Sequence, residues 1–225
     1  MIDNFNRFVI ANLEILLQGL WITVQVCACA FGLALLLGLA ACLIRLYVPF
    51  VRVLAIGYIE FFRATPIFVQ LLWVNYVWPE VFGFPSTAFQ AGILALALQS
   101  SGYLAETFRS GIEGLQKGQV EAGKAIGMTP GRIFRRIVAP QVLLVMAPGL
   151  INQIAVVVKS STLVSVIAIP DLMYQAFKIV NQWFEPIEVL TSTALLYFAV
   201  IFAISLAANR LSGHFRAKFG LAAGG

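Results

Sequence analysis

The side chains in this sequence that could do chemistry are isolated polar groups within long apolar runs. Gln99, Tyr103 and Glu106 are four and three residues apart, so a helix would place them on one face. Asn152 and Lys159 are seven residues apart and would share one face of another helix. Lys159 could meet the carboxylate of a zwitterion, and Glu106 could meet its ammonium group or a cationic side chain.

Three more polar residues adjoin these faces. Ser101 lies beside the first face, Gln153 lies beside the second, and Gln70 follows Pro66 by one helical turn. Proline lacks an N–H group and kinks a helix, which frees a carbonyl oxygen. Polar groups near the middle of a bilayer are costly unless they are used, and the binding sites of transporters tend to lie there. These residues are therefore candidates for a substrate pathway.

Structural roles stay open for the same groups. Glu106 could pair with Arg109 at the inner end of its helix, and the long side chain of Lys159 could extend to the outer membrane surface. The side chains of Gln99, Asn152 and Gln153 could form hydrogen bonds between neighbouring helices. Glu60 and Arg63, three residues apart, are expected to form a local ion pair near the inner membrane surface.

Enzymatic chemistry has no residues to support it. The only histidine, His214, is close to the C-terminus, so no nucleophile–base pair or metal cluster can be assembled around it. The three cysteines lie in one apolar stretch and are interpreted as packing residues. Residues 118–125 nearly match a phosphate-binding loop, but Ala125 replaces the hydroxyl residue that holds magnesium. We expect no catalytic residue, no metal site and no cofactor bound by this chain.

The elements that position these groups must be membrane spans. Of the 225 residues, 60% are hydrophobic and 11% are charged, and the mean hydropathy is +0.91. Soluble domains are about 45–50% apolar and about 25% charged. The composition therefore excludes an ordinary soluble globule and a disordered chain. The net charge of +5 sits at the ends of the apolar runs, so no nucleic-acid partner is expected.

Runs without charged residues divide the chain into five expected spans. A spanning helix needs about 20 apolar residues, and four of the runs meet that length. The shorter run, 64–79, reaches it by extending backwards through 53–59. We expect an all-α, polytopic membrane protein with one domain over residues 1–225. Its transmembrane helices are predicted at about 20–43, 56–78, 87–108, 138–162 and 189–210.

Lysine and arginine residues set the orientation of these spans. Most of them fall between spans one and two, between spans three and four, or after span five. The positive-inside rule then places the N-terminus outside and the C-terminus in the cytoplasm. Residues 168–188, which include Asp171, are expected to form an external loop with a helical segment.

The cytoplasmic segment 109–137 has the pattern of short helices at the membrane surface. Gly127 suits the position after a helix end, and Thr129 followed by Pro130 suits a helix start. An interfacial loop whose basic residues contact lipid headgroups is the alternative from periodicity alone.

Two stretches of this segment resemble the EAA signature of ABC importer permeases. They are Val-Glu-Ala-Gly-Lys-Ala-Ile-Gly-Met at 120–128 and Ile-Val-Ala-Pro-Gln at 137–141. The sequence departs from the family pattern at Gly123, where a second alanine is usual, and at Ala139, where leucine is usual.

Three other stretches, 63–70, 101–109 and 159–167, are similar to segments of the polar amino-acid branch of that family, which serves histidine, glutamine, glutamate, arginine and opines. The resemblance covers roughly residues 10–215. It implies the type I ABC importer transmembrane-domain fold in the bacterial cytoplasmic (inner) membrane. The implied partners are two ATPase subunits that carry ATP and magnesium, a second permease chain, identical or homologous, an external solute-binding protein, the lipid bilayer and a polar amino acid as substrate.

The resemblance also implies a docking site for the ATPase in this loop. Small residues allow close approach of a partner, and Glu121 could pair with a partner arginine or cap a helix. A local pair with Lys124 on a solvated face is the alternative for Glu121. The expected coupling residues are Glu121, Ala122, Gly123, Ala125 and Gly127.

Other functions stay open at this point. The chain could serve another ABC import branch, such as methionine or phosphonate. An ion-coupled secondary transporter is disfavoured because five spans cannot divide into two equal inverted repeats. A scaffold without transport activity would leave the polar groups near the midplane unexplained.

Overall fold

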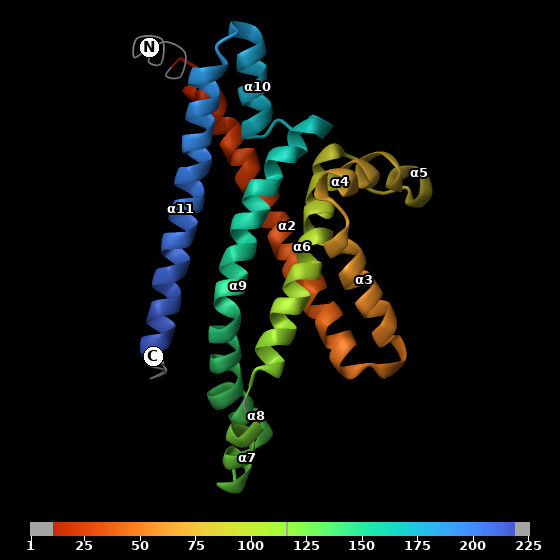
Figure 1. The fold of residues 1–225 in the computed structure, drawn as a ribbon, viewed down its shortest axis with the longest axis vertical. Coiled ribbons are helices and arrows are strands. Elements are labelled where there is room, and N and C mark those ends of the chain that lie inside the picture. Colours follow the sequence, from red (N-terminus) through yellow and green to blue (C-terminus); the bar gives the residue numbers. More distant parts are fainter. Residues whose placement is uncertain (1–10, 116, 219–225) are drawn as a thin grey trace.

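The computed structural model describes residues 11–115 and 117–218, and the secondary structure of this part is helical, without strands (Figure 1). The all-α prediction is confirmed. The α-helices are α2 (Leu13–Tyr47), α3 (Arg52–Ala64), α4 (Ile67–Tyr76), α5 (Trp78–Phe82), α6 (Ala88–Glu113), α7 (Lys117–Ala125), α8 (Pro130–Ile133), α9 (Ala139–Ser160), α10 (Leu172–Trp183) and α11 (Pro186–Lys218). Three short helical turns join them: η2 (Pro49–Val51), the π-helical η3 (Phe134–Val138) and η4 (Ser161–Ile167).

Helix α6 lies at the centre of the packing and contacts α2, α3, α4 and α9. Its most extensive contact is with α2, which crosses Figure 1 diagonally. Gly38 makes this contact close, because a Cβ atom there would lie 2.8 Å from the Ser101 carbonyl oxygen and 2.9 Å from the Leu104 Cβ. Buried alanines line the same seam, as expected where helices associate in lipid through small residues.

The second predicted span, 56–78, is not one continuous helix. Helices α3 and α4 meet at an angle of 107° at the Thr65–Pro66 step. A residue before proline avoids helical geometry, and Thr65 is extended, with φ −76° and ψ 129°. Its N–H and its hydroxyl both donate to the Phe61 carbonyl oxygen and close the end of α3. The predicted kink is therefore a sharp break, after which α4 and α5 run across Figure 1 rather than along α3.

Three helical stretches are long and apolar enough to cross a membrane: Leu13–Tyr47, Pro130–Ile167 and Pro186–Ala208. The bent pair Pro49–Ala64 and Ile67–Tyr76 would count as a fourth. The third predicted span, 87–108, coincides with α6, whose 26 residues extend about 39 Å. Helix α6 is not among the three stretches named above, and its middle carries polar residues such as Ser100 and Ser101.

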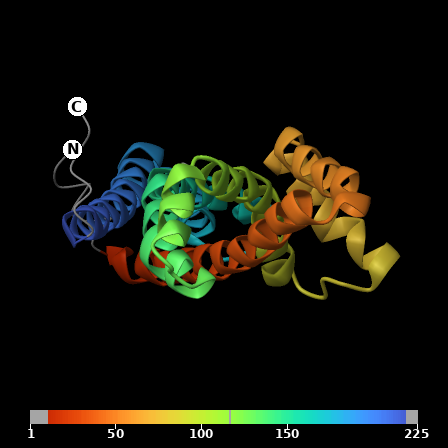
Figure 2. The ribbon, with the colours of Figure 1, turned by 90° about the horizontal axis from the view of Figure 1, so that it is seen from below.

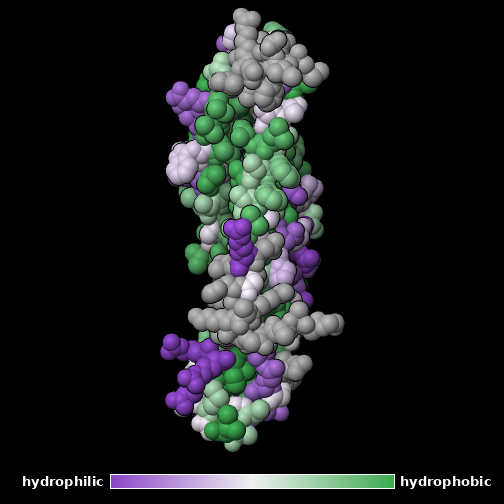
Figure 3. Space-filling view, turned by 90° about the vertical axis from the view of Figure 1, so that its left-hand side faces the viewer, coloured by the Kyte–Doolittle hydropathy of each residue, from purple (hydrophilic) through white to green (hydrophobic). Residues whose placement is uncertain are grey.

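The two ends of the molecule differ in character. Helix α10 caps one end, and α7 and α8 form the other (Figure 1). Seen from the second end, α11 lies on one side and α3 and α5 lie on the other, with α6 and α9 between them (Figure 2). Apolar side chains cover much of the upper part of the face in Figure 3, whereas hydrophilic side chains gather near the α7–α8 end. This distribution matches an apolar membrane belt with a polar end at α7 and α8.

The close contact at Gly38 gives a first test of the packing. Gly38→Ala should lower the free energy of unfolding by about 1–3 kcal/mol, because the new methyl group must displace α6. Gly32→Ala is the matched control on the same helix, since nothing lies within 4 Å of a Cβ atom there. Thermal unfolding in detergent compares the two variants. Equal melting temperatures would contradict the α2–α6 contact.

Candidate functional site

The loop between α6 and α9 is built as two short helices joined by a tight turn. Helix α7 ends at Ala125, and Gly127 in the turn that follows has a φ of 75°, which is left-handed and suits glycine. The N–H groups of Gly127 and Met128 donate to the carbonyl oxygens of Lys124 and Gly123, each at 3.0 Å. Helix α8 then begins at Pro130. The turn at Gly127 after the helix end and the start after Thr129 are as the sequence predicts.

Gly123 differs from the other coupling candidates because it faces inward. A Cβ atom there would lie 3.1 Å from Ile137 Cδ1 and 3.2 Å from Ile133 Cγ1. Its small size therefore allows α7 to pack on α8 and η3, rather than allowing a partner to approach. The remaining candidates are exposed and available to a partner: Glu121, Ala122, Ala125 and Gly127.

Sequence reasoning missed an apolar component of this loop. Ile126 is 78% exposed and Phe134 is 60% exposed, although both are large apolar residues. The sequence does contain a signal for this apolar surface, because Ile126 is a large apolar residue next to a charged stretch. No ion pair joins Glu121 to Lys124 in the part of the chain that the structure describes. The loop thus presents an acidic group and apolar side chains together.

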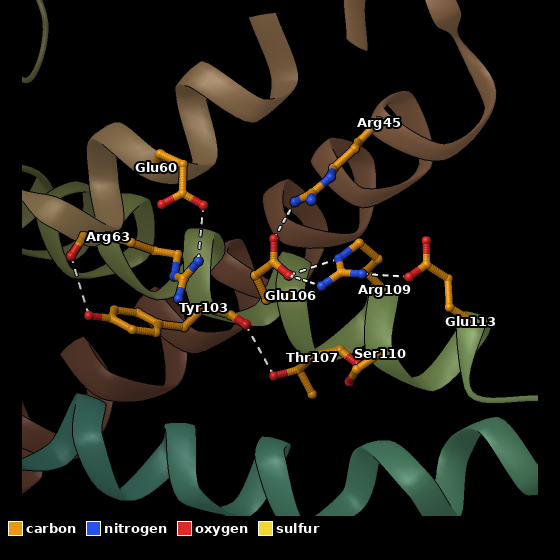
Figure 4. Close-up of polar contacts among 9 residues, drawn as sticks. All are labelled: Arg45, Glu60, Arg63, Tyr103, Glu106, Thr107, Arg109, Ser110 and Glu113. Atoms are coloured by element: carbon orange, nitrogen blue, oxygen red, sulfur yellow. Dashed lines mark hydrogen bonds and ion pairs between the residues drawn. The ribbon is translucent and has the colours of Figure 1, made fainter. Parts of the chain in front are cut away.

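A chain of four charged side chains ties the C-terminal part of α6 to α2 (Figure 4). The Glu106 carboxylate pairs with Arg45 of α2 and with Arg109, whose Nη2 lies at 2.7 Å. Arg109 also pairs with Glu113 one turn further along α6. The pairing of Glu106 with Arg109, one of the two sequence alternatives, is present. The Arg45 contact was missed, because the two residues lie 61 positions apart.

A second polar cluster joins α6 to the end of α3 (Figure 4). The Tyr103 hydroxyl donates to the Arg63 carbonyl oxygen at 3.3 Å, and the Arg63 guanidinium carbon lies 5.4 Å from the centre of the Tyr103 ring. Arg63 Nη1 is 3.1 Å from a Glu60 carboxylate oxygen, so the predicted local ion pair is present.

Two of the pathway candidates are buried and connect elements. Ser101 is fully buried, donates to the Leu98 carbonyl oxygen and accepts from the Tyr58 hydroxyl, each at 2.7 Å. Gln70 is also buried and donates to the Ala95 carbonyl oxygen at 3.0 Å, which links α4 to α6. Hydrogen bonds between helices were not an alternative considered for Ser101 and Gln70 from the sequence, yet both side chains make them.

Lys159 and Glu106, which the sequence suggested as the two groups that bind one zwitterion, do not lie close together in the structure. A Cβ atom on Gly149 would lie 2.7 Å from Thr107 Cγ2, so Glu106 is level with this part of α9. Lys159 lies ten residues further along α9, which is about 15 Å. Helices α6 and α9 run in opposite directions, and the two charges are too far apart for the backbone of one zwitterion.

The remaining pathway candidates occupy different surroundings. Asn152 is exposed close to the middle of α9, and Lys159 is exposed in its last turn. Gln153 is buried, and its Nε2 has no hydrogen-bond partner in the structure. Gln99 is partly buried.

Asp171 is fully buried, whereas the sequence predicted an external loop position for it. Its carboxylate caps α10 by accepting from the Tyr174 N–H at 2.9 Å, and it accepts from the Tyr197 hydroxyl of α11 at 3.3 Å. Burial raises the pKa of the Asp171 carboxyl to about 6. The Leu172 N–H donates to Thr23 of α2 at 3.1 Å. The Asp171 carboxylate and the neighbouring Leu172 N–H therefore join α2, α10 and α11 at one end of the molecule.

The charge chain makes a second prediction about stability. Glu106→Gln should lower the free energy of unfolding by about 1–3 kcal/mol, because it weakens contacts with two arginines at a side chain only 20% exposed. Glu113→Gln removes one contact at a side chain 51% exposed and should cost less than about 1 kcal/mol. Thermal unfolding of both variants checks the order. A larger loss for Glu113→Gln would contradict it.

Comparison with known proteins adds to this geometry. A family model described as "Binding-protein-dependent transport system inner membrane component" matches residues 30–220. The arginine transport system permease protein ArtQ of Bacillus subtilis is 31% identical over 198 residues, which cover 87% of this chain and 90% of that relative. The probable glutamine ABC transporter permease protein GlnM of the same organism is 32% identical over 218 residues and 94% of each chain.

Solved structures agree with these relatives. A crystal structure of an amino acid ABC transporter with histidines matches with a TM-score of 0.82 and 32% identity, covering 92% of this chain and 96% of that one. The MetNI methionine ABC transporter matches with a TM-score of 0.76 at 18% identity and shares the fold. The expected type I ABC importer permease fold is thus confirmed. The chain belongs to the family of inner membrane components of binding-protein-dependent transport systems.

Proposed function

We propose that this chain is the translocation subunit of an importer that carries a polar amino acid, or a close derivative, into the cytoplasm. ATP hydrolysis in a separate ATPase drives the import, and an external solute-binding protein delivers the substrate. The names of the relatives, which refer to arginine and glutamine transport, support this substrate class. The observation that carries the proposal is the exposed α7–α8 loop, which offers Glu121 and Ile126 to a partner.

The loop is connected so that a push on it moves the spans. Helix α6 leads to α7 within a few residues after Glu113, and α8 continues through η3 into α9. Gly123 packs α7 onto Ile133 and Ile137, so the loop moves as one body. The Arg45–Glu106 contact then passes movement of α6 to α2. ATP-driven closure of the partner would rotate these helices together.

The complete importer would contain more chains than this one. Two ATPase subunits would bind the loops of two permease chains, the second being identical to this chain or homologous to it. ATP and magnesium would be held by the ATPase, and this chain would bind no cofactor. The exposed Arg132, Arg135 and Arg136 beside the loop support a cytoplasmic position for this end. The N-terminus would then lie outside and the C-terminus inside.

Methionine transport is a weaker alternative, because the solved methionine transporter is only 18% identical to this chain. Ion-coupled transport without an ATPase would require a driving ion. Both alternatives are separated from the proposal by reconstitution. Proteoliposomes that contain this chain with its ATPase and binding protein should import labelled L-arginine, L-glutamine or L-histidine. Import should require ATP on the side of the membrane where the ATPase lies. Import driven by an ion gradient alone would overturn the proposal.

Glu121 tests the docking role in the same vesicles. Glu121→Lys should lower ATP-driven import by about 10-fold or more, because it reverses an exposed charge at a tightly packed protein contact. Binding-protein-stimulated ATP hydrolysis should fall with it. Glu14→Lys, the same change at the exposed start of α2, is the control and should leave import near the native rate. Native import by the Glu121→Lys variant would contradict docking at this residue.

Orientation can be measured by labelling with a membrane-impermeant maleimide. In a background with the native cysteines replaced, Asn181→Cys on α10 should react in intact cells, because this end is assigned to the outside. Gln119→Cys on α7 should react only after the membrane is permeabilised. The opposite labelling pattern would invert the assignment and place the α7–α8 loop outside.

A further inference from the structure

Three arginines where α8 continues into η3 carry charges that this chain does not neutralise. Arg132, Arg135 and Arg136, called the arginine trio below, are all exposed. Within the residues that the structure describes, the ion pairs involve other arginines. A guanidinium stays charged at any physiological pH and offers five N–H donors in a planar fork. The trio is therefore open to an anionic partner outside the chain.

The trio lies on the side of its helix that faces away from α7. Its members are three and four residues apart, so they share one helical face. Ile133 and Ile137 lie on the other side, where they pack against Gly123 of α7. Glu121, the residue proposed to dock the ATPase, is exposed on α7. An ATPase bound to α7 would thus leave the trio free for a different partner.

The trio also marks one end of the apolar part of α9. Residues 137–158 carry no charged side chain, Arg136 directly precedes them and Lys159 directly follows them. At 1.5 Å per residue this run is about 33 Å long, close to the thickness of about 30 Å of the hydrocarbon layer. The run therefore fits the layer, and the trio falls at the level of the lipid headgroups.

The local helix geometry favours an anion at the same place. Arg132 lies in the first turn of α8, where the helix dipole favours negative groups, yet that turn holds no acidic residue. Arg135 and Arg136 lie in the π-helical turn η3, and such turns are frequent at functional sites. Three neighbouring cations at the start of a helix repel one another and the dipole, and a bound anion would offset both effects.

We propose that the arginine trio binds the headgroup phosphate of an anionic phospholipid in the leaflet nearest the α7–α8 loop. Guanidinium groups pair with phosphate oxygens through two parallel hydrogen bonds, and basic clusters beside a membrane span attract anionic lipids. The headgroup level of the trio and its position away from α7 favour a lipid over the ATPase as the occupant.

The bound lipid has a mechanical role in this arrangement. It holds the start of α9 at the membrane surface, so a push on the α7–α8 loop tilts α9 about this point instead of displacing it along the membrane normal. The lipid site goes beyond the proposed function, because it requires neither the substrate nor the ATPase.

Native mass spectrometry of the full chain in detergent measures the site directly. The probes are phosphatidylglycerol and phosphatidylcholine with the same acyl chains, and the native chain should retain phosphatidylglycerol in preference. Arg136→Gln should weaken binding of the most tightly held phosphatidylglycerol about 5-fold. The triple variant Arg132→Gln/Arg135→Gln/Arg136→Gln should weaken it about 100-fold, because the attraction accumulates over the three charges.

Two further variants separate charge from structure. Lys124→Gln is the matched control, because it removes an exposed cation from α7, and it should bind phosphatidylglycerol as the native chain does. Arg132→Lys/Arg135→Lys/Arg136→Lys keeps the charges without the paired hydrogen bonds, so it should bind within about 10-fold of native. Thermal unfolding of these variants should stay close to native, since the altered side chains are exposed.

Three results would overturn the inference. The first is equal retention of the two lipids by the native chain. The second is an equal loss of phosphatidylglycerol binding in the glutamine and lysine triple variants. The third is native lipid binding by the glutamine triple variant together with loss of its co-purification with the ATPase, which would make the trio an ATPase contact.

Import into proteoliposomes provides a second readout. Native ATP-driven import should rise with the phosphatidylglycerol content of the bilayer, and import by the glutamine triple variant should not. An equally steep rise in both proteins would refute the mechanical role of the lipid. If the native importer takes up no amino acid, the transport proposal fails, whereas the lipid site is still decided by the mass spectra.

Discussion

The hydrocarbon of a membrane offers no hydrogen bonds, so every polar group of α6 must find a partner in protein or in trapped water. This constraint explains why α6 lies at the centre of the fold. Ser101 is satisfied by Tyr58 of α3, and Gln70 of α4 reaches the backbone of α6 at Ala95. Glu106 is satisfied by Arg45 of α2. Each of these contacts attaches a different helix to the same central one.

The break at Thr65–Pro66 gives this arrangement its asymmetry. Because α4 turns away, α3 alone, with 13 residues or about 20 Å, continues the direction of this span up to the break. Glu60 and Arg63 lie in the last turns of α3, immediately before the break. The α7–α8 loop follows the C-terminal end of α6, so the proposed docking loop is joined directly to the central helix.

Much of the local structure could be predicted from the sequence. Gly127, Thr129 and Pro130 specify a helix end and a helix start, and the apolar runs specify the long helices. The inward orientation of Gly123 and the contact between Arg45 and Glu106 could not be predicted, because they depend on how distant segments are set in register. The separation of Lys159 from Glu106 along the helix axes could not be predicted for the same reason. Periodicity places side chains on a face but not at a depth relative to another helix.

Burial of Asp171 has a consequence for the outer rim of the protein. Its folded pKa of about 6 exceeds the ordinary value of 3.8, so the native state takes up a proton more readily than the unfolded chain does. The contribution of this carboxyl to stability is therefore greatest below the unfolded value and declines as the pH rises toward 6. Acidification from pH 6 toward 3.8 would thus tighten the junction of α2, α10 and α11, whereas a change from neutral to alkaline pH would leave this contribution unaltered.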